Sequence, residues 1–370
     1  LGSELLPPTD PRQLAVRLVG VPGQRVESTA EVVATVEGIL HQVAGEHVVA
    51  EATEQDIAAV TAAARQVRER HDKLEGELAE VVADAGLPDG FFYVVTGDRD
   101  TVAPSLSPAL VDKIAFTGST EIRKKLVEQC AGTMKRTSME LGGNAPVIVF
   151  DDADLDAAVA GAAASKYRNS GQTCICANRI LVQDTIYDEF VAELKKVVGT
   201  YKVGNGLDES VTHGPIITRK ALEDIKALVD DAVGHGATVA AGGEFGEGDS
   251  QFVEPTILCK VNSDMRVFKE EIFGPIAPIF KFSTEEEAIA MANDTEFGLA
   301  AYLYTGDQGR SWRVAEGIEY GMVGVNESLF TSQYIPFGGV KESGQGREGS
   351  RYGIDEYVET KFICLGNLDA

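Results

Sequence analysis

VIVFDDADLDAAVAGAAASKY, residues 147–167, joins a β-rich run to a helical window through an acidic turn. The residues of VIVF (147–150) favour a strand. The alanine-rich window after the turn favours a helix, for which Asp152 is a plausible N-cap. The stretch therefore predicts a strand followed by a helix, which is the repeating unit of an α/β fold.

The same alternation continues on both sides of this stretch. Upstream, KIAFTG (113–118) favours a strand that leads into a helix over 118–130. Downstream, RILVQ (179–183) precedes a helix over 185–201, whose apolar face is spaced for 3.6 residues per turn: Ile186, Phe190, Val191, Leu194 and Val198. Further β-rich runs lie at 91–95, 276–282, 300–305 and 322–326. Strands separated by helices of this length predict parallel sheets with helices on both faces.

The charge of the chain is strongly negative. Its 33 basic residues stand against 58 acidic ones, which gives a net charge of −25. Such a field repels nucleic acid and anionic lipid, so neither is expected as a partner. The apolar runs are too short for a membrane-spanning helix, and the first residues lack the order of a signal peptide.

The cysteines and histidines exclude two kinds of site. Five cysteines without regular spacing do not suggest a disulfide framework, and they favour a reducing, cytoplasmic setting. The five histidines are scattered, and neither CxxC nor HxxxH spacing accompanies the CxC of residues 174–176. No metal site is predicted.

GQTCIC (171–176) places two thiols one residue apart after a glycine-rich turn. A nucleophilic cysteine needs a base or a lowered pKa, and no histidine lies beside Cys174 in the sequence. A carboxylate from elsewhere is the remaining option, and ELGGNAP (140–146) offers Glu140 in a second glycine-rich turn. Taken alone, these residues leave open both a structural cysteine and a nucleophile.

Four motifs in a fixed order resolve the choice. ELGGNAP (140–146), GQTC (171–174), EEIFGP (270–275) and PFGGVKESGQGREG (336–349) resemble the ordered signature of the aldehyde dehydrogenase superfamily. KYRNSGQTCICANR is similar to its succinate-semialdehyde dehydrogenase branch. The resemblance runs from about Leu74 through Leu365.

The resemblance implies a covalent mechanism. Cys174 attacks the aldehyde carbon to form a thiohemiacetal, and a hydride then passes from this intermediate to a nicotinamide. The backbone N–H of Cys174 donates to the oxyanion. Glu140 activates the water that hydrolyses the resulting thioester.

The resemblance also implies a site for NAD or NADP, between which the sequence does not choose. Gly118 and Ser119, at a strand-to-helix turn, meet the pyrophosphate, where helix N–H groups favour anions. Glu271 holds the hydroxyls of the nicotinamide ribose, Phe273 packs nearby, and Leu141 belongs to the same cofactor site.

Arg168 is expected to bind the acid end of a semialdehyde, because an arginine can grip a carboxylate with two hydrogen bonds. The alternative is an arginine at a helix end or on the surface. Phe337 would line the substrate tunnel, and Ser332 would add a hydrogen bond. Cys176 either forms a redox-sensitive disulfide with Cys174 or packs as a small apolar residue.

The chain departs from the family in three respects. Family members are usually longer, by on the order of 100 residues, and the missing part lies between the predicted helix that contains ARQV (64–67) and the segment that begins LEGELAEVV (74–82). The asparagine that completes the oxyanion hole and the lysine that grips the adenosine ribose have no counterpart. Loss of one oxyanion donor typically costs about 2.7–4 kcal/mol of transition-state stabilisation. Arg123 also stands where the family usually has glycine.

We therefore predict an α/β fold of the aldehyde dehydrogenase type, with two parallel-sheet domains of which the cofactor-binding one is incomplete. Residues 1–73 keep part of its first strand and helix, and 74–140 form its remaining Rossmann-like part. Residues 141–342 form the catalytic domain, and 343–370 return to the cofactor domain and end in an oligomerisation strand.

The predicted function is NAD(P)-dependent oxidation of succinate semialdehyde or a similar semialdehyde by a cytoplasmic homo-oligomer. Two alternatives remain open for a shortened homologue that does not oxidise aldehydes. One is a thiol esterase or acyl-binding protein, and the other is a non-catalytic partner of a full-length relative.

Overall fold

The computed structural model describes residues 111–248 and 250–365. The predicted strand at 91–95, the segment 1–73 and most of the segment 74–140 lie outside the described residues. Most of the described chain, residues 116–129 and 137–365 apart from 249, belongs to one compact unit. The described residues 111–115 and 130–136 belong to a second unit.

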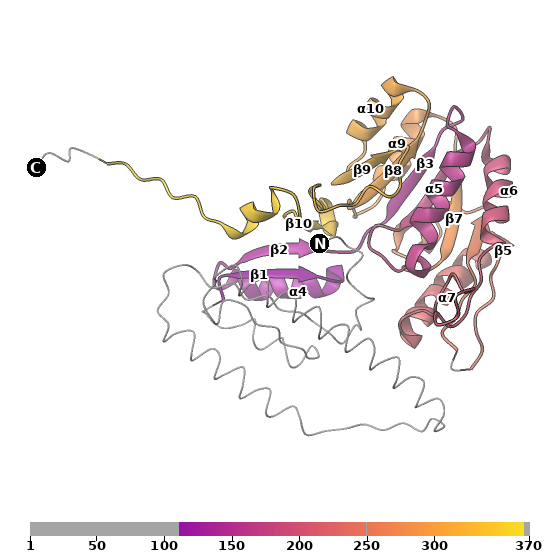
Figure 1. The fold of residues 1–370 in the computed structure, drawn as a ribbon, viewed down its shortest axis with the longest axis horizontal. Helices are drawn as coiled ribbons and strands as arrows, with labels where there is room; N and C mark the ends of the chain where they lie inside the picture. The colour runs from indigo at the N-terminus through magenta and orange to yellow at the C-terminus, as the bar shows by residue number, and fades with distance from the viewer. Residues whose placement is uncertain (1–110, 249, 366–370) are drawn as a thin grey trace, which may run out of the picture. The chain divides into compact units, whose positions relative to one another are not determined.

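The order of the elements follows the predicted alternation (Figure 1). The strands are β1 (Lys113–Thr117), β2 (Arg136–Glu140), β3 (Ala145–Val149), β4 (Ala177–Gln183), β5 (Thr238–Ala241), β6 (Thr256–Cys259), β7 (Ile276–Phe282), β8 (Ala300–Tyr304), β9 (Met322–Val325) and β10 (Gly344–Gln345). The α-helices are α4 (Thr120–Ala131), α5 (Leu155–Tyr167), α6 (Tyr187–Val198), α7 (Arg219–Gly234), α8 (Arg266–Lys269), α9 (Glu285–Asn293) and α10 (Gln308–Gly317). Short 3₁₀ turns are η3 (Arg168–Gly171), η4 (Lys341–Ser343) and η5 (Gly353–Tyr357).

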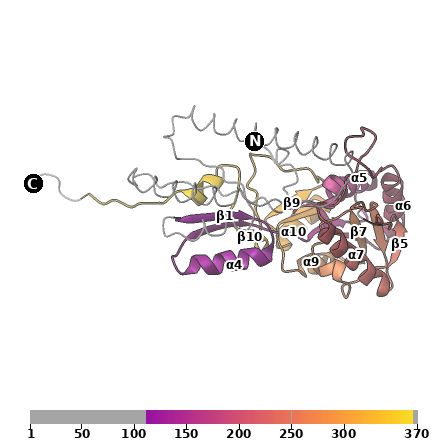
Figure 2. The same cartoon turned by 90° about the horizontal axis from the view of Figure 1, so that it is seen from below.

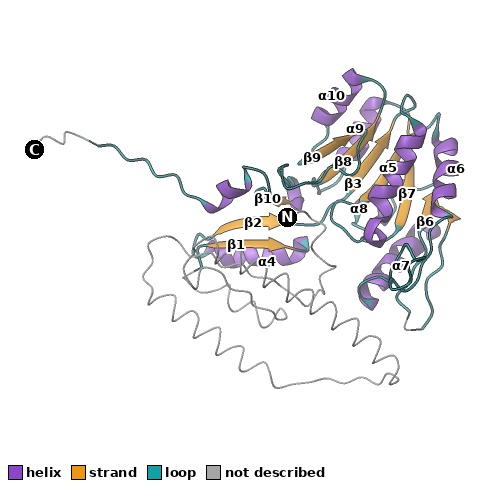
Figure 3. Ribbon diagram, in the orientation of Figure 1, coloured by secondary structure: helices purple, strands orange, loops and turns teal. Residues whose placement is uncertain are grey.

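The larger sheet has seven strands in the order β5-β6-β7-β4-β3-β8-β9 (Figure 3). Its neighbouring strands run parallel, except that the edge strand β5 pairs antiparallel with β6. Helices cover both faces of the sheet (Figures 1 and 2). The predicted parallel sheet between two helical layers is confirmed here.

Alternate residues of the central strands enter two separate hydrophobic cores. Ile148 of β3 and Leu181 of β4 join the core that includes residues of α7, α8, α9 and α10. Their neighbours Val147 and Ile180 join the core that includes residues of α5 and α6. Because successive side chains of a strand point to opposite faces, a continuous apolar run supplies both cores at once.

The N-cap of α5 differs from the prediction. Asp154, not Asp152, caps the helix, and its Oδ1 accepts a hydrogen bond from Ala157 N at 3.0 Å. Asp152 instead accepts from the Thr305 hydroxyl at 2.8 Å and pairs with Arg310 at 2.8 Å. The acidic turn holds several possible caps, and the contacts that engage Asp152, with Thr305 just after β8 and with Arg310 of α10, are distant in sequence.

A smaller sheet in the order β1-β2-β10 carries Glu140 at the end of β2. β10 pairs antiparallel with β2, and Gly344 lies opposite Glu140. The backbone N–H of Gly118 donates to the carbonyl of Glu140 at 3.0 Å. The turn that precedes α4 is thereby fixed to the backbone of the predicted base.

Within the described part of the chain, no helix is both long and apolar enough to cross a membrane. Residues 358–365 of the predicted C-terminal strand form neither helix nor strand here. Their apolar side chains are exposed, Phe362 to 87%. The role of this segment in oligomerisation stays a prediction.

Candidate active site

The loops that carry the four motifs meet around the turn Gly142–Gly143. The backbone N–H of Gly143 donates to Glu271 Oε1 at 2.9 Å. A β-carbon on Gly143 would lie 2.4 Å from the carbonyl oxygen of Cys174, so only glycine leaves room for that approach. Oε1 of Glu140 lies 2.9 Å from the place that a β-carbon on Gly338 would take. The structure therefore brings Glu140, Cys174 and Glu271 together, as the motifs predicted.

The loop before Cys174 is a tight left-handed turn. Asn169, Ser170 and Gly171 have φ angles of 51°, 54° and 75°. A β-carbon on Gly171 would lie 2.1 Å from the carbonyl oxygen of Gly274, so the GQTC and EEIFGP segments touch through their backbones. This turn reverses the chain at the end of α5 and delivers Cys174 to the start of β4.

Cys174 lies partly buried between acidic groups. Burial, the nearby carboxylates of Glu271 and Glu140 and the thiol of Cys176 together raise the pKa of its thiol to about 12, and the backbone N–H of Cys174 partly offsets this rise. A raised pKa favours the protonated thiol over the thiolate.

Glu140 is 6% exposed. Its Oε2 is buried and has no hydrogen-bond partner among the described residues. Burial and, to a smaller extent, the charge of Glu348 raise the pKa of Glu140 to about 8, although the charge of Arg347 lowers it. A carboxyl group with a pKa near neutrality can take and return a proton, which suits a general base.

Glu271 shares its surroundings with a buried lysine. Lys166 of α5 is 1% exposed. Burial raises the pKa of Glu271 and lowers that of Lys166, and each charge partly offsets the shift of the other. The Gly143 N–H also lowers the pKa of Glu271. An acid and a base with opposed shifts therefore lie beside the thiol loop.

Cys176 is buried and is a free thiol, as is Cys174. Its Sγ lies 2.9 Å from the Thr173 hydroxyl and donates to the carbonyl of Arg168 at 3.7 Å. These contacts hold the two thiols in one loop. The disulfide between them stays a prediction.

The guanidinium of Arg168 is half-buried and has no carboxylate within 4.0 Å among the residues that the structure describes. Burial raises the pKa of the Tyr302 hydroxyl, and Cys176 and Cys174 raise it too, whereas the positive charge of Arg168 lowers it. The charge of Arg168 and the two thiols therefore act on the same buried hydroxyl group.

The other predicted residues lie in several settings. Gly118 and Ser119 form the exposed turn directly before α4. Leu141 is 2% exposed, and Phe273 is 39% exposed with a φ of 51°. Phe337 packs against the same hydrophobic core as Cys174, whereas Ser332 is exposed in the loop after β9. The roles assigned to these residues stay predictions.

Five residues of the site were missed by sequence reasoning: Asn144, Lys166, Asn178, Arg347 and Glu348. All five stand inside the quoted motifs. Their residue types alone gave no signal, because buried amides and lysines are uncommon and their partners are distant in sequence. The pair Arg347 and Glu348 could have been found as charges inside a glycine-rich motif.

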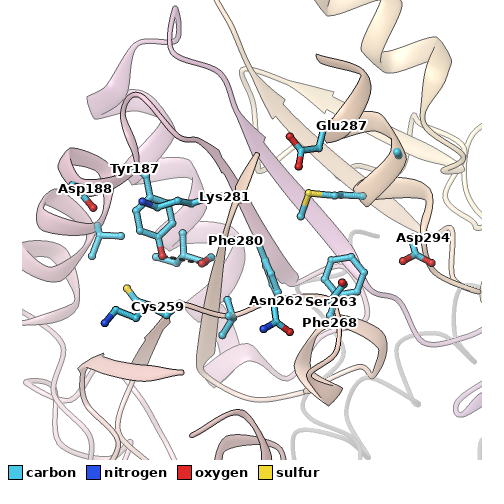
Figure 4. A pocket seen from close by; sticks show the side chains of 16 residues that line it. Tyr187, Asp188, Cys259, Asn262, Ser263, Phe268, Phe280, Lys281, Glu287 and Asp294 are labelled. Carbon is cyan, nitrogen blue, oxygen red and sulfur yellow. Dashed lines mark hydrogen bonds between the residues drawn. The ribbon is translucent and has the colours of Figure 1, made fainter. Parts of the chain in front are cut away.

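A separate cavity of about 980 Å³ lies beyond the end of β6 (Figure 4). Its walls include Tyr187, Cys259, Phe268, Lys281 and Met291. None of the predicted site residues lines it, so the four motifs do not belong to this cavity. Among the described residues, no cluster of three histidine, cysteine or acidic side chains could hold a metal ion.

Comparison with known proteins shows to which family this chain belongs. The sequence model described as the aldehyde dehydrogenase family matches residues 72–363, more than half of the chain. The chain belongs to the aldehyde dehydrogenase family. The predicted resemblance and fold type are therefore confirmed.

Two relatives illustrate the position of this chain in the family. It is 54% identical to glutarate-semialdehyde dehydrogenase of Pseudomonas aeruginosa over 292 residues, which are 79% of this chain and 60% of that protein. It is 53% identical to the NADP(+) succinate-semialdehyde dehydrogenase of Escherichia coli over 290 residues, which are 78% of this chain and 60% of that protein.

A crystal structure of an aldehyde dehydrogenase from Brucella melitensis biovar abortus has the same fold. It is 56% identical to the chain and superposes with a TM-score of 0.74 over 77% of this chain and 59% of that one. The chain thus spans about 60% of the length of the family members that it matches.

Proposed function

We propose that this chain oxidises a semialdehyde to the corresponding acid, with NAD or NADP as the hydride acceptor and Cys174 as the nucleophile. The observation that carries the proposal is that Gly143 contacts both Glu271 and the backbone of Cys174, while the carboxylate of Glu140 is close enough to act on the Cys174 thiol. Cys174 and Glu140 supply the two functions that aldehyde oxidation through a thioester requires.

The chain's own residues account for the covalent steps. The thiol proton of Cys174 passes to water, the sulfur bonds to the aldehyde carbon, and the backbone N–H of Cys174 donates to the oxygen that takes up the carbonyl electron pair. After the hydride has left, a thioester remains on Cys174. Glu140 takes a proton from water, the water oxygen bonds to the acyl carbon, and the carbon–sulfur bond breaks; Glu140 then returns its proton to the sulfur, which leaves the acid and the thiol.

The residues present fit the nicotinamide end of such a cofactor. When bound, the oxidised nicotinamide ring supplies the hydride acceptor. Glu271 is anchored by the Gly143 N–H through Oε1, which leaves Oε2 able to accept from ribose hydroxyls. Phe273 would pack beside the ring. The exposed turn Gly118–Ser119 opens the 12-residue helix α4, whose N-terminus favours a phosphate group.

Arg168 supports a substrate with a carboxylate at its far end. The guanidinium lacks an acidic partner among the described residues, in a chain with a net charge of −25. A dicarboxylate semialdehyde needs such a local cation to approach a site with two glutamates. Two of the relatives bear the names of succinate- and glutarate-semialdehyde dehydrogenases, which supports the same substrate class.

A cofactor-independent thiol esterase is the second candidate, favoured by the effect of the Glu140 carboxylate on the thiol of Cys174. The Cys174–Glu140 pair lies within the described residues and could hydrolyse an activated ester without a cofactor. We further propose that the chain acts as a cytoplasmic homo-oligomer, which the exposed apolar side chains near Phe362 support.

Calorimetry with NAD and with NADP, together with the absorbance of reduced cofactor formed from succinate semialdehyde, tests the proposal. We expect one cofactor to bind and to be reduced, and we expect Cys174→Ser to abolish reduction without abolishing binding. A chain that binds neither cofactor and reduces neither contradicts the proposal. Hydrolysis of a nitrophenyl ester that depends on Cys174 would then favour the esterase.

A further inference from the structure

The side chain of Asn178 bridges the backbone on both sides of Glu271. Its Nδ2 donates to the carbonyl of Glu270 at 2.9 Å, and its Oδ1 accepts from the N–H of Ile272 at 3.0 Å. Asn178 lies near the start of β4, four residues after Cys174, and is 3% exposed. One amide group thus ties the strand that follows the nucleophile to the backbone that carries Glu271.

The same amide reaches the motif that carries Glu140. Nδ2 of Asn178 also donates to Oδ1 of Asn144 at 2.6 Å. Asn144 is fully buried, and its own Nδ2 donates to the carbonyl of Phe268 at 3.0 Å. β3 and β4 pair beside these residues, with Ala145 opposite Ala177. The two asparagines therefore connect the segments that hold Glu140, Cys174 and Glu271.

Apart from the bond between the two amides, these bonds end on the carbonyl of Phe268 in α8 and on the backbone of Glu270 and Ile272 just after it. A buried amide that lost its partners would be costly, so the network stays in one arrangement. The backbone at Glu270 and Ile272 is consequently held at two points. The Glu271 side chain leaves from a fixed position toward Gly143.

We propose that Asn178 is a positioning residue that fixes Glu271 for the nicotinamide ribose. This inference rests on the proposed function, because it assigns the held carboxylate to cofactor binding. Loss of the bridge frees the Glu271 backbone, whereas β4, the Cys174 thiol and the Arg168 side chain remain in place. The effect should therefore fall on the cofactor and spare the aldehyde.

The chain contains a matched control. Asn293 at the end of α9 donates through Nδ2 to the carbonyl of Gly317 at 2.8 Å and accepts from the N–H of Glu319 at 2.8 Å. This bridge spans Ile318 as the Asn178 bridge spans Glu271. Asn293→Ala therefore removes the same two kinds of bond at a place that carries no site residue.

The experiment compares Asn178→Ala and the isosteric Asn178→Asp with Asn293→Ala and the wild type in the full chain. Asn178→Asp keeps the acceptor for Ile272 and the side-chain shape, so it serves where the alanine variant does not fold. The readouts are the KM for NAD or NADP, the KM for succinate semialdehyde, and the rate at which iodoacetamide alkylates Cys174.

We expect both Asn178 variants to raise the KM for the cofactor by about tenfold, the effect of losing one or two hydrogen bonds. The KM for the aldehyde and the alkylation rate should stay within about twofold, and Asn293→Ala should change none of the three. An unchanged cofactor KM in the Asn178 variants, or an equal rise in Asn293→Ala, overturns the inference alone. A wild-type chain that reduces no cofactor overturns the proposed function, and this inference with it.

Discussion

The backbone N–H of Gly143 donates to Glu271 Oε1 at 2.9 Å, while the Cα of the same glycine lies against the carbonyl of Cys174. Gly143, in the turn that follows Glu140, thus contacts both Glu271 and Cys174. The arrangement depends on the absence of a side chain at this position.

Gly143→Ala is expected to displace the nucleophile loop. Its β-carbon would meet the Cys174 carbonyl at 2.4 Å, so the backbone must move. We expect a loss of about 1–3 kcal/mol of unfolding free energy and a larger proportional loss of activity. Thermal denaturation and steady-state kinetics check both. Gly206→Ala is the control, because no atom lies within 4 Å of its β-carbon; equal effects in the two variants would refute the argument.

Arg168→Ala should weaken the binding of charged aldehydes only. We expect the KM for succinate semialdehyde to rise by roughly 10- to 100-fold, as for the loss of a charged hydrogen bond. The KM for an uncharged aldehyde of the same length should not rise. Arg219→Ala, which removes an exposed charge from α7, controls for net charge. A similar rise for both aldehydes would exclude a carboxylate contact.

Hydrolysis of the thioester should follow the ionisation of Glu140. Because the pKa of Glu140 is raised to about 8, the rate should rise with pH toward that value. Glu348→Gln removes a negative neighbour and should move the midpoint down, whereas Arg347→Gln removes a positive one and should move it up, each by about one pH unit. Single-turnover pH profiles measure the midpoints. Shifts in one common direction would contradict the assignment.

Glu140 should also make stability depend on pH. Its pKa in the folded chain exceeds the ordinary value, so between about pH 5 and pH 8 the folded state binds more protons than the unfolded one. The unfolding free energy should therefore fall with rising pH, by at most about 1.4 kcal/mol per pH unit from this group. The glutamine of Glu140→Gln does not titrate. The unfolding free energy of this variant relative to that of the wild type should therefore increase with pH across this window and level off above it. Denaturant titrations at several pH values measure this difference in unfolding free energy. A difference that stays constant with pH would contradict a buried, protonated Glu140.

Oxidation should join the two thiols of the nucleophile loop. Cys176 is held by Thr173 and the carbonyl of Arg168, close in sequence to Cys174. Peroxide treatment is expected to give a Cys174–Cys176 linkage that thiols reverse, together with a reversible loss of activity. Peptide mass spectrometry detects the bond. In Cys176→Ser the sulfenic acid on Cys174 stays open to further oxidation, so a larger share of the lost activity should not return with thiol; an equal share in the two proteins would rule out protection by the linkage.

The strands and helices of the larger sheet could be predicted because their signals are local. VIVF and RILVQ carry strand-forming residues, and Phe190 and Leu194 mark the buried face of the following helix. The cap of α5 could not be chosen among neighbouring aspartates, since Asp152 is engaged by Thr305, 153 residues away. Such choices depend on tertiary contacts that no local window contains.

The site was predictable to the extent that its residues stand in motifs. Glu140, Cys174 and Glu271 were found through glycine-rich turns in a fixed order, and the structure brings them together. Asn178 was not found, because its partners at Glu270 and Ile272 lie more than 90 residues away. The effect of Glu348 on Glu140 was missed for the same reason.

The backbone contact between Gly171 and Gly274 has a mechanical consequence. With no free volume between them, the loop that holds the thiol cannot shift toward the EEIFGP segment, and the bridge of Asn178 resists its withdrawal. Cys174 and Glu271 must then move as a single rigid body, so the geometry between them is set during folding. Any opening needed to admit a reactant or release a product has to come from segments other than these two.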